Sequence, residues 1–156
     1  MAKAKRAPVT SASEQVRIMS AATRQIEPPS TVELDDCDMP FFANVIDEFA
    51  RSEWTAHQLE LAAMLARMMA DLEREQRLLR SEGAVMKTKA GTPVVNPRKT
   101  VVQMHAGSIM SMRRSLSLHA RAQGGGDTAK IGRRTAIAKA VEADNPMADD
   151  LIARPN

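Results

Sequence analysis

The feature that most constrains the fold is a long segment, residues 55–81, that contains neither glycine nor proline. Its apolar seam follows alternating steps of four and three along Gln58, Ala62, Leu65, Met69, Leu72, Gln76 and Leu79. This heptad spacing predicts one helix, about 40 Å long at ~1.5 Å per residue, with a narrow seam that glutamine interrupts. Gly83 is expected to end the helix, because glycine readily adopts the left-handed conformation of a helix terminus.

Residues 84–95 follow this helix and predict a β-hairpin. Two valine-containing arms flank a turn in which Gly91 can adopt a positive φ. Pro93 lacks an N–H group, so its arm belongs at a sheet edge or at the start of a strand. An isolated two-stranded hairpin is marginally stable in water, and we therefore expect this one to pack against the long helices or against another subunit.

A second long helix is predicted after the hairpin, with Asn96 as its N-cap and Pro97 at its first position. We expect it to run to near Gln123, and its apolar face is supplied by Val101, Val102, Met104, Ile109, Met112, Leu116 and Leu118. Arg98 and Lys99 oppose the helix dipole in the first turn, by about 0.3–1 kcal/mol each. An acidic neighbour or DNA would offset that cost; the alternative is that both side chains extend into solvent.

The N-terminal part, residues 1–39, is expected to be a flexible basic arm, a possible short helix and an acidic, proline-rich linker. Ser11 and Glu14 have capping-box spacing, which predicts a helix over residues 11–26. The next helix is expected over about residues 40–51, with Asp38 as its cap. Its helically spaced apolar side chains are Phe41, Phe42, Val45, Ile46 and Phe49.

The predicted fold class is therefore mainly α, with short N-terminal helices and two long packed helices joined by a β-hairpin. Residues 40–123 are expected to be a helical oligomerisation core that assembles as a ring, and residues 124–156 a glycine hinge with a flexible tail that holds at most a short, detachable helix. Aromatic residues make up only 3% of the chain, so the core must come from aliphatic side chains and methionine, which suits helices packed on helices.

Catalytic and metal-binding patterns are weak in this sequence. Cys37 is the single cysteine, which excludes an internal disulfide and a cysteine-based zinc site. His57, His105 and His119 lack partners at ligand spacing, and the aspartates around residue 36 resemble a solvated acidic turn more than a calcium loop. We expect no enzymatic activity, no cofactor, no metal and no membrane association, in a soluble protein of a reducing cytoplasm.

Charge is distributed unevenly along the chain. An acidic block, residues 25–60, lies between basic blocks at residues 1–24 and 61–126. Such segregation suits a protein with one acidic face and one side that faces a polyanion, although ordinary solvated helix surfaces would give a similar pattern.

The order of these elements resembles the small terminase subunit of tailed bacteriophages, over about residues 41–122. The resemblance is carried by "EGAV" at 82–85, "TKAGTPVVNP" at 88–97 and "SLSLHARAQ" at 115–123. That family commonly ends the last helix in a Leu-Gly-Leu-type turn. Ser117 replaces the glycine here, which predicts that the helix continues farther.

The resemblance implies a ring of identical subunits that binds double-stranded viral DNA at the packaging site and passes it to the large terminase subunit, an ATPase and nuclease. It also implies action in the cytoplasm of the bacterial host and no stable place in the mature virion. Two other functions stay open: a helical connector or adaptor of the virion without sequence-selective DNA binding, and a small DNA-binding regulator that uses the helix at 11–26.

Two groups of candidate functional residues follow. The arm and the 1–26 segment are expected to be the principal DNA contact and the later tail an auxiliary one, with Arg113, Arg114 and Arg121 as a competing basic group. The DNA-binding candidates are Lys3, Lys5, Arg6, Arg17, Arg24, Lys130, Arg133, Arg134 and Lys139. The candidate oligomerisation residues are Leu65, Met69, Leu72, Leu79, Val102, Ile109, Met112 and Leu116.

Overall fold

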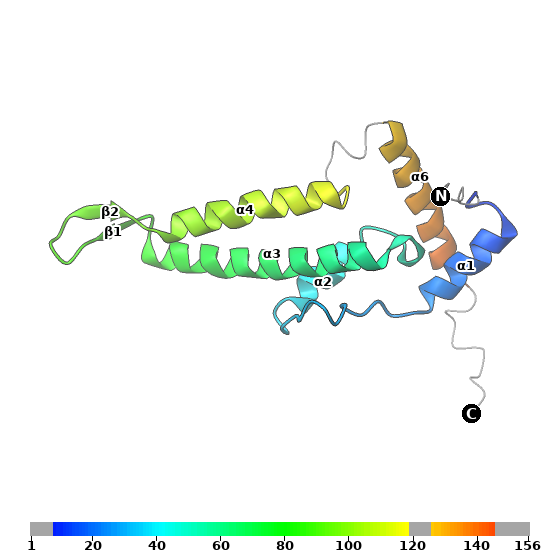
Figure 1. Cartoon of the computed structure of the whole chain (residues 1–156), viewed down its shortest axis with the longest axis horizontal. Helices are drawn as coiled ribbons and strands as arrows, with labels where there is room; N and C mark the ends of the chain where they lie inside the picture. The colour runs from blue at the N-terminus through cyan, green and yellow to red at the C-terminus, as the bar shows by residue number, and fades with distance from the viewer. Residues whose placement is uncertain (1–7, 119–125, 146–156) are drawn as a thin grey trace, which may run out of the picture. The chain divides into compact units, whose positions relative to one another are not determined.

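The computed structural model describes residues 8–118 and 126–145 and is mainly helical (Figure 1). Its elements are the helices α1 (Ala12–Ala22), α2 (Met39–Ile46), α3 (Ala56–Glu82), α4 (Arg98–Ser115) and α6 (Gly126–Ala143), the 3₁₀ turn η1 (Arg51–Glu53), and the strands β1 (Val85–Lys87) and β2 (Pro93–Val95). Within the described ranges, no helix is both long and apolar enough to cross a membrane.

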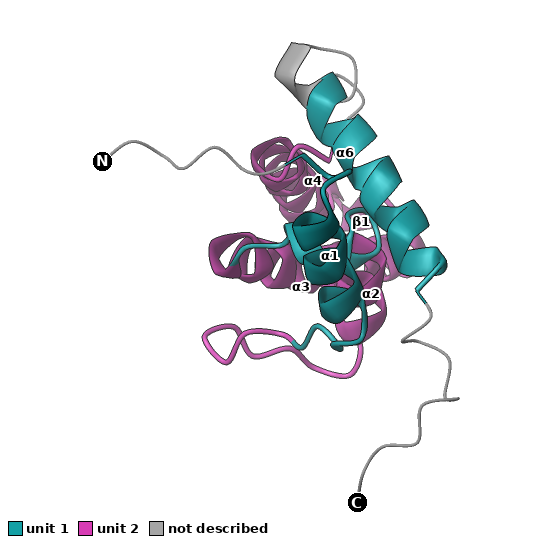
Figure 2. Cartoon of the chain, turned by 90° about the vertical axis from the view of Figure 1, so that its right-hand side faces the viewer, with its two compact units in different colours: residues 1–27, 46–55, 120–156 teal, residues 28–45, 56–119 magenta. Residues whose placement is uncertain are grey.

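The chain forms two compact units, coloured separately in Figure 2. Unit 1 comprises Met1–Glu27, Ile46–Thr55 and Ala120–Asn156, and unit 2 comprises Pro28–Val45 and Ala56–His119. This grouping differs from the expected division at residues 39/40 and 123/124. The difference arises because α1 and α6 pack with each other, and η1, in the segment after α2, contacts α1.

Unit 2 is built on α3 and α4, which run antiparallel and side by side (Figure 1). The predicted helix over 55–81 is confirmed, because α3 differs from it by one residue at each end. Leu65 of α3, Ile109 of α4 and Leu116, which follows α4, are buried within this single chain. Small side chains at Ala62 and elsewhere along α3 allow close helix packing, so the seam forms the interior of a helical hairpin.

The predicted β-hairpin is present beyond the ends of α3 and α4. Val85 pairs with Val95, Met86 with Val94, and Lys87 with Pro93 in an antiparallel register. Gly83 and Gly91 adopt φ values of 85° and 81°, which glycine reaches without the steric cost of a side chain.

Helix α4 ends at Ser115, earlier than the predicted end near Gln123, so that prediction is wrong for the described part of the chain. Ser117 adopts a left-handed φ of 60°. The N–H of Leu118 donates to the carbonyl of Arg113 at 2.8 Å, and the N–H of Ser117 to that of Arg114 at 3.0 Å. These two bonds form a Schellman motif. The turn is therefore made without a glycine.

Helix α2 ends at Ile46, although the phenylalanine spacing predicted a helix to about residue 51. The indole Nε1 of Trp54 donates to the Ile46 carbonyl at 3.1 Å, and the Trp54 ring meets Phe49 edge-on at 5.3 Å. The late apolar positions of the pattern therefore pack around a turn instead of extending the helix.

Unit 1 joins α1, η1 and α6 around a small apolar cluster. Val9, Ile18, Ala50 and Ala138 are buried together, with Val141 packed against them. Helix α6 has 18 residues and packs on α1, where the sequence predicted at most a short, detachable helix. Small apolar side chains spaced three apart gave too weak a periodic signal to predict this helix.

Candidate nucleic-acid interface

Four charged side chains from three distant segments meet inside unit 1. Arg17 of α1 donates to both carboxylate oxygens of Glu14, with Nε–Oε2 at 3.1 Å and Nη2–Oε1 at 2.8 Å. Arg134 of α6 donates from Nε to Glu53 Oε2 at 3.1 Å and also binds Glu14 Oε1. Arg17 completes the network through Glu53 Oε1 at 3.4 Å. These four residues are called the carboxylate–arginine network.

The network is largely removed from solvent. The Glu14 and Arg134 side chains are 8% and 19% exposed, whereas Arg17 is 40% exposed. The hydrogen bond from Arg17 lowers the pKa of Glu14, against the opposing effect of burial, and the same bond raises the pKa of Arg17. The network therefore keeps its charges paired and fastens α6 and η1 to α1.

Glu14 shows why the N-terminal capping box forms only in part. Its backbone N–H donates to Ser11 Oγ at 3.4 Å, as the sequence predicts. Its carboxylate does not return to the N–H of Ser11, which donates to the carbonyl of Pro8. The carboxylate binds the two arginines instead, because a cation is a stronger partner than a neutral amide.

Lys130 and Arg133 occupy the outward side of α6. Thr135 and Ala138 on its packing side are buried, whereas Lys130, Arg133 and Ile137, spaced three and four apart, are exposed. Arg133 Nε donates to the Ala129 carbonyl of the preceding turn at 3.2 Å, which leaves its guanidinium group on the surface of the helix. Adjacent arginines thus have different positions, with Arg133 outward and Arg134 inside the network.

The remaining DNA-binding candidates fall into different environments. Arg24 is exposed just beyond α1. Lys139 is exposed and its Nζ donates to the Asp47 carbonyl. Lys3, Lys5 and Arg6 lie outside the described residues.

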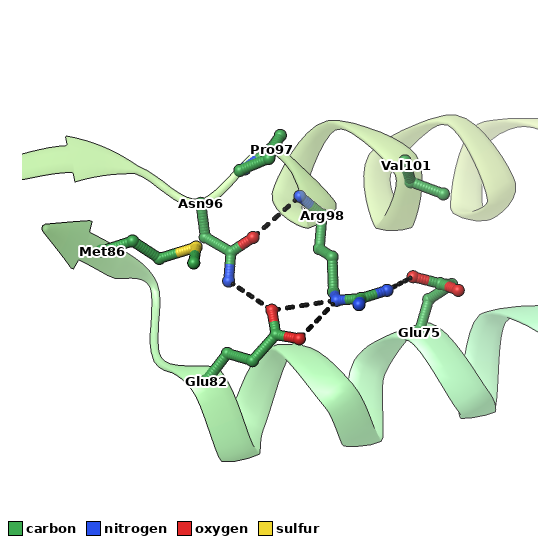
Figure 3. Close-up of a pocket in the computed structure, with 7 residues that line it drawn as sticks. All are labelled: Glu75, Glu82, Met86, Asn96, Pro97, Arg98 and Val101. Atoms are coloured by element: carbon green, nitrogen blue, oxygen red, sulfur yellow. Dashed lines mark hydrogen bonds and ion pairs between the residues drawn. The ribbon is translucent and has the colours of Figure 1, made fainter. Parts of the chain in front are cut away.

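In unit 2, Asn96 connects the hairpin to both long helices (Figure 3). It is 1% exposed, accepts the N–H of Arg98 on Oδ1, and donates from Nδ2 to Glu82 and to the Gly83 carbonyl, each at 3.0 Å. Asn96 thus accepts an N–H of the first turn, as predicted, although α4 begins at Arg98 and Pro97 precedes it as the N-cap residue. The Asn96 amide also binds the end of α3.

The unfavourable positive charge of Arg98 at the N-terminus of α4 is paired with carboxylates. Its guanidinium binds Glu82 at 2.9 Å and Glu75 at 2.7 Å, so the acidic partner is α3 of the same chain. The hydrogen bonds to Glu82 and Glu75 raise the pKa of Arg98, and the bonds from Arg98 and Asn96 lower the pKa of Glu82. Lys99, the second basic residue of this turn, is exposed.

The candidate oligomerisation residues divide by burial. Leu65, Ile109 and Leu116 are enclosed by their own chain, which gives them a role in the interior of unit 2. The partly exposed members are Met69, Leu72, Leu79, Val102 and Met112. These five side chains retain exposed apolar surface.

The described residues include one group with metal-ligand proximity, Asp35, Cys37 and Asp38, whose ligand atoms lie within 4.8 Å of one another. Asp38 is buried and its carboxylate accepts the N–H of Asp35 at 3.0 Å, so the turn is less solvated than predicted. Partial desolvation and the neighbouring Asp38 raise the pKa of the Cys37 thiol. These contacts give the acidic residues a role in shaping the turn.

A family model described as the Hendrixvirinae small terminase family matches residues 1–156. The chain belongs to the Hendrixvirinae small terminase family. Its role is therefore in phage DNA packaging inside the host cell, and the family is in general the non-catalytic subunit of the terminase. No curated protein matches the sequence.

Sequence reasoning missed the carboxylate–arginine network of this small terminase. It treated Arg17 and Arg134 only as DNA-binding candidates, and it did not consider Glu14 and Glu53 as their partners. One signal was available, because Arg134, Ala138 and Val141 are spaced by four and three and so share the packing face of α6. The segment that supplies Glu53 could not be identified without the tertiary fold.

Proposed function

We propose that this small terminase is a ring-forming subunit that binds double-stranded viral DNA at the packaging site and passes it to the large terminase subunit. In this proposal it has no catalytic role of its own and no stable place in the mature virion. The observation that carries the DNA-binding part is the outward display of Lys130 and Arg133 on α6, which packs on α1, the first helix after the basic arm in the sequence.

The basic residues of the arm closely precede, in the sequence, a residue that packs in unit 1. Val9 is buried against Ala138 in the apolar cluster of unit 1. Arg6 precedes Val9 by three residues, so chain length alone limits their Cα separation to about 11 Å. Arg6, Lys5 and Lys3 can therefore act on the same DNA segment as Lys130 and Arg133, with Arg24 and Lys139 as further contacts.

Arg17 and Arg134 have a supporting role in this proposal. Both are already paired with carboxylates, and a phosphate would have to displace Glu14 or Glu53 to bind them. Phosphate contacts from exposed lysine and arginine side chains dominate the affinity of proteins for DNA and make it depend on salt. Ring formation would present many copies of such a weak site, so avidity would raise the affinity.

The test measures DNA binding by fluorescence anisotropy across a salt series, with packaging-site DNA and a scrambled duplex. Lys130→Ala/Arg133→Ala and a chain that lacks residues 1–7 should each bind more weakly. The slope of log K against log salt should become shallower by about 0.9 for each phosphate that the variant no longer neutralises. Native mass spectrometry of the same samples should give one unchanged ring mass.

Arg80→Ala/Lys99→Ala is the matched control, because it removes the same charge from exposed positions of unit 2. Its affinity and salt slope should equal those of the wild type. The assignment to unit 1 is wrong if both unit 1 variants bind normally while Arg113→Ala/Arg114→Ala loses binding. A ring that prefers no DNA sequence would favour the connector function, and a DNA-selective dimer would favour the regulator.

A further inference from the structure

The β-hairpin carries an exposed apolar pair on the face turned away from α3 and α4. Side chains alternate between the two faces of a strand, so the Val85–Val95 pair and the Lys87–Pro93 pair share one face, and Met86 and Val94 share the other. Val85 and Val95 are 61% and 65% exposed. Val85, Lys87, Pro93 and Val95 are called the outer valine face.

The hydrogen-bond pattern brings the two valines close together. The N–H of Asn96 donates to the Ala84 carbonyl and that of Thr88 to the Thr92 carbonyl, so these pairs are the hydrogen-bonded ones. Val85–Val95 and Lys87–Pro93 are then non-hydrogen-bonded pairs, whose side chains lie closer together. Pro93 faces the outer edge of β2 without an N–H to offer, which disfavours strand addition there and leaves the face available for docking.

A second surface lies on the other side of the hairpin, where it meets the long helices. Met86, Pro97 and Val101 line an open hollow of about 530 Å³, together with Asn96 and the charged group of Glu75, Glu82 and Arg98 (Figure 3). This site is called the joint hollow.

The two surfaces are complementary in charge as well as in polarity. The joint hollow contains two carboxylates and one guanidinium, which gives it one excess negative charge. The outer valine face has Lys87 beside its two valines. A hairpin seated in the hollow would bury apolar surface on both sides and would place its lysine near Glu75 and Glu82.

We propose that the outer valine face of one chain docks in the joint hollow of a second copy of the same chain. The two surfaces differ, so the contact is heterologous: each chain offers its hairpin to one neighbour and its hollow to the other, and repetition closes a ring when the rotation permits. This inference rests on the proposed ring and specifies which surfaces build it.

Directed cross-linking tests the contact in full-length chains. In a Cys37→Ser background, Val95→Cys and Val101→Cys are combined in one chain, and oxidised samples are separated without reductant. The expected result is a ladder of covalent multimers, because each cysteine reaches a different neighbour. A disulfide between the two introduced cysteines of one chain would have to reach from the outer valine face to the other side of the hairpin. It would leave the protein at the mass of a single chain, without a ladder.

Each alternative result overturns the docking arrangement. Dimers from Val95→Cys alone would show that two valine faces meet symmetrically. A normal ring mass without cross-links would leave the proposed ring intact and reject this contact. Cross-links to the large subunit alone would assign the face to that partner. If the Cys37→Ser parent forms no ring at any concentration, the ring proposal itself fails as well.

A charge variant gives an independent measurement by native mass spectrometry over a dilution series. Lys87→Glu should raise the protomer concentration at half-assembly about tenfold or more, because it would face the carboxylates of the joint hollow. Lys89→Glu makes the same charge change in the exposed turn and should alter that concentration less than about twofold. Equal effects of the two variants would contradict the proposal, and helix content by circular dichroism confirms that both are folded.

Discussion

The two units of this small terminase are stabilised by different means. Unit 2 buries the aliphatic seam of α3 and α4, and one group of its charged residues, Glu75, Glu82 and Arg98, meets at the joint around Asn96. Unit 1 has an apolar cluster of mostly small side chains and relies on the carboxylate–arginine network to join α1, η1 and α6. We therefore expect salt and acid to weaken unit 1 more than unit 2, in which the Glu82–Arg98 pair is the acid-sensitive contact of the joint.

The largest expected effect is in the seam of unit 2. Leu65→Ala should lower the free energy of unfolding by about 2–5 kcal/mol, because Leu65 is fully buried and its truncation leaves a cavity. Urea unfolding followed by circular dichroism measures this change. Met64→Ala at the adjacent, partly exposed position is the control and should cost less than about 1 kcal/mol. Similar losses for both variants would contradict the assignment of Leu65 to the interior of one chain.

The next effect is in the network of unit 1. Arg134→Ala leaves Glu14 and Glu53 with one arginine between them and should destabilise the docking of α6 by about 2 kcal/mol. Hydrogen exchange of the α6 amides should accelerate while exchange in α3 stays unchanged. Arg133→Ala, at the neighbouring outward position, should change α6 exchange by less than about 0.5 kcal/mol. Unaltered protection of α6 in Arg134→Ala would show that the network does not hold it.

Lowering the pH should destabilise unit 1 more than unit 2. The pKa of Glu14 is lowered from its ordinary value of 4.5, so the folded unit binds this proton less readily than the unfolded chain does. Its contribution is therefore fully present above pH 4.5 and is lost as the pH falls through the lower folded value. Hydrogen exchange between pH 6 and pH 3 should show α1 and α6 opening before the buried seam of α3. Glu14→Gln should weaken unit 1 at neutral pH and flatten its acid response, and an unchanged response would exclude Glu14 as its source.

The sequence predicted unit 2 far better than unit 1, for a physical reason. Heptad spacing, Gly83, Gly91 and Asn96 are local signals, and each acts on residues near it in the chain. Unit 1 depends on contacts between α1 and α6, and no local pattern pairs Glu14 with Arg134. Lys130 and Arg133 could be proposed as DNA contacts from their charge alone. Only the packing face of α6 in the structure shows that Arg134, with the same charge, is instead bound inside the network.

The smallest effect concerns the end of α4, which the sequence predicted too far along the chain. Ser117 adopts φ 60°, and a side chain in this left-handed region costs about 1–2 kcal/mol relative to glycine. Ser117→Gly should therefore stabilise unit 2, by about 1 kcal/mol once the greater freedom of glycine in the unfolded chain is included. Ser115→Gly, two residues earlier and inside α4, should destabilise it by about 0.5–1 kcal/mol. Opposite shifts of the urea midpoint would locate the end of the helix between these positions, whereas destabilisation by both substitutions would mean that α4 continues through Ser117 in solution.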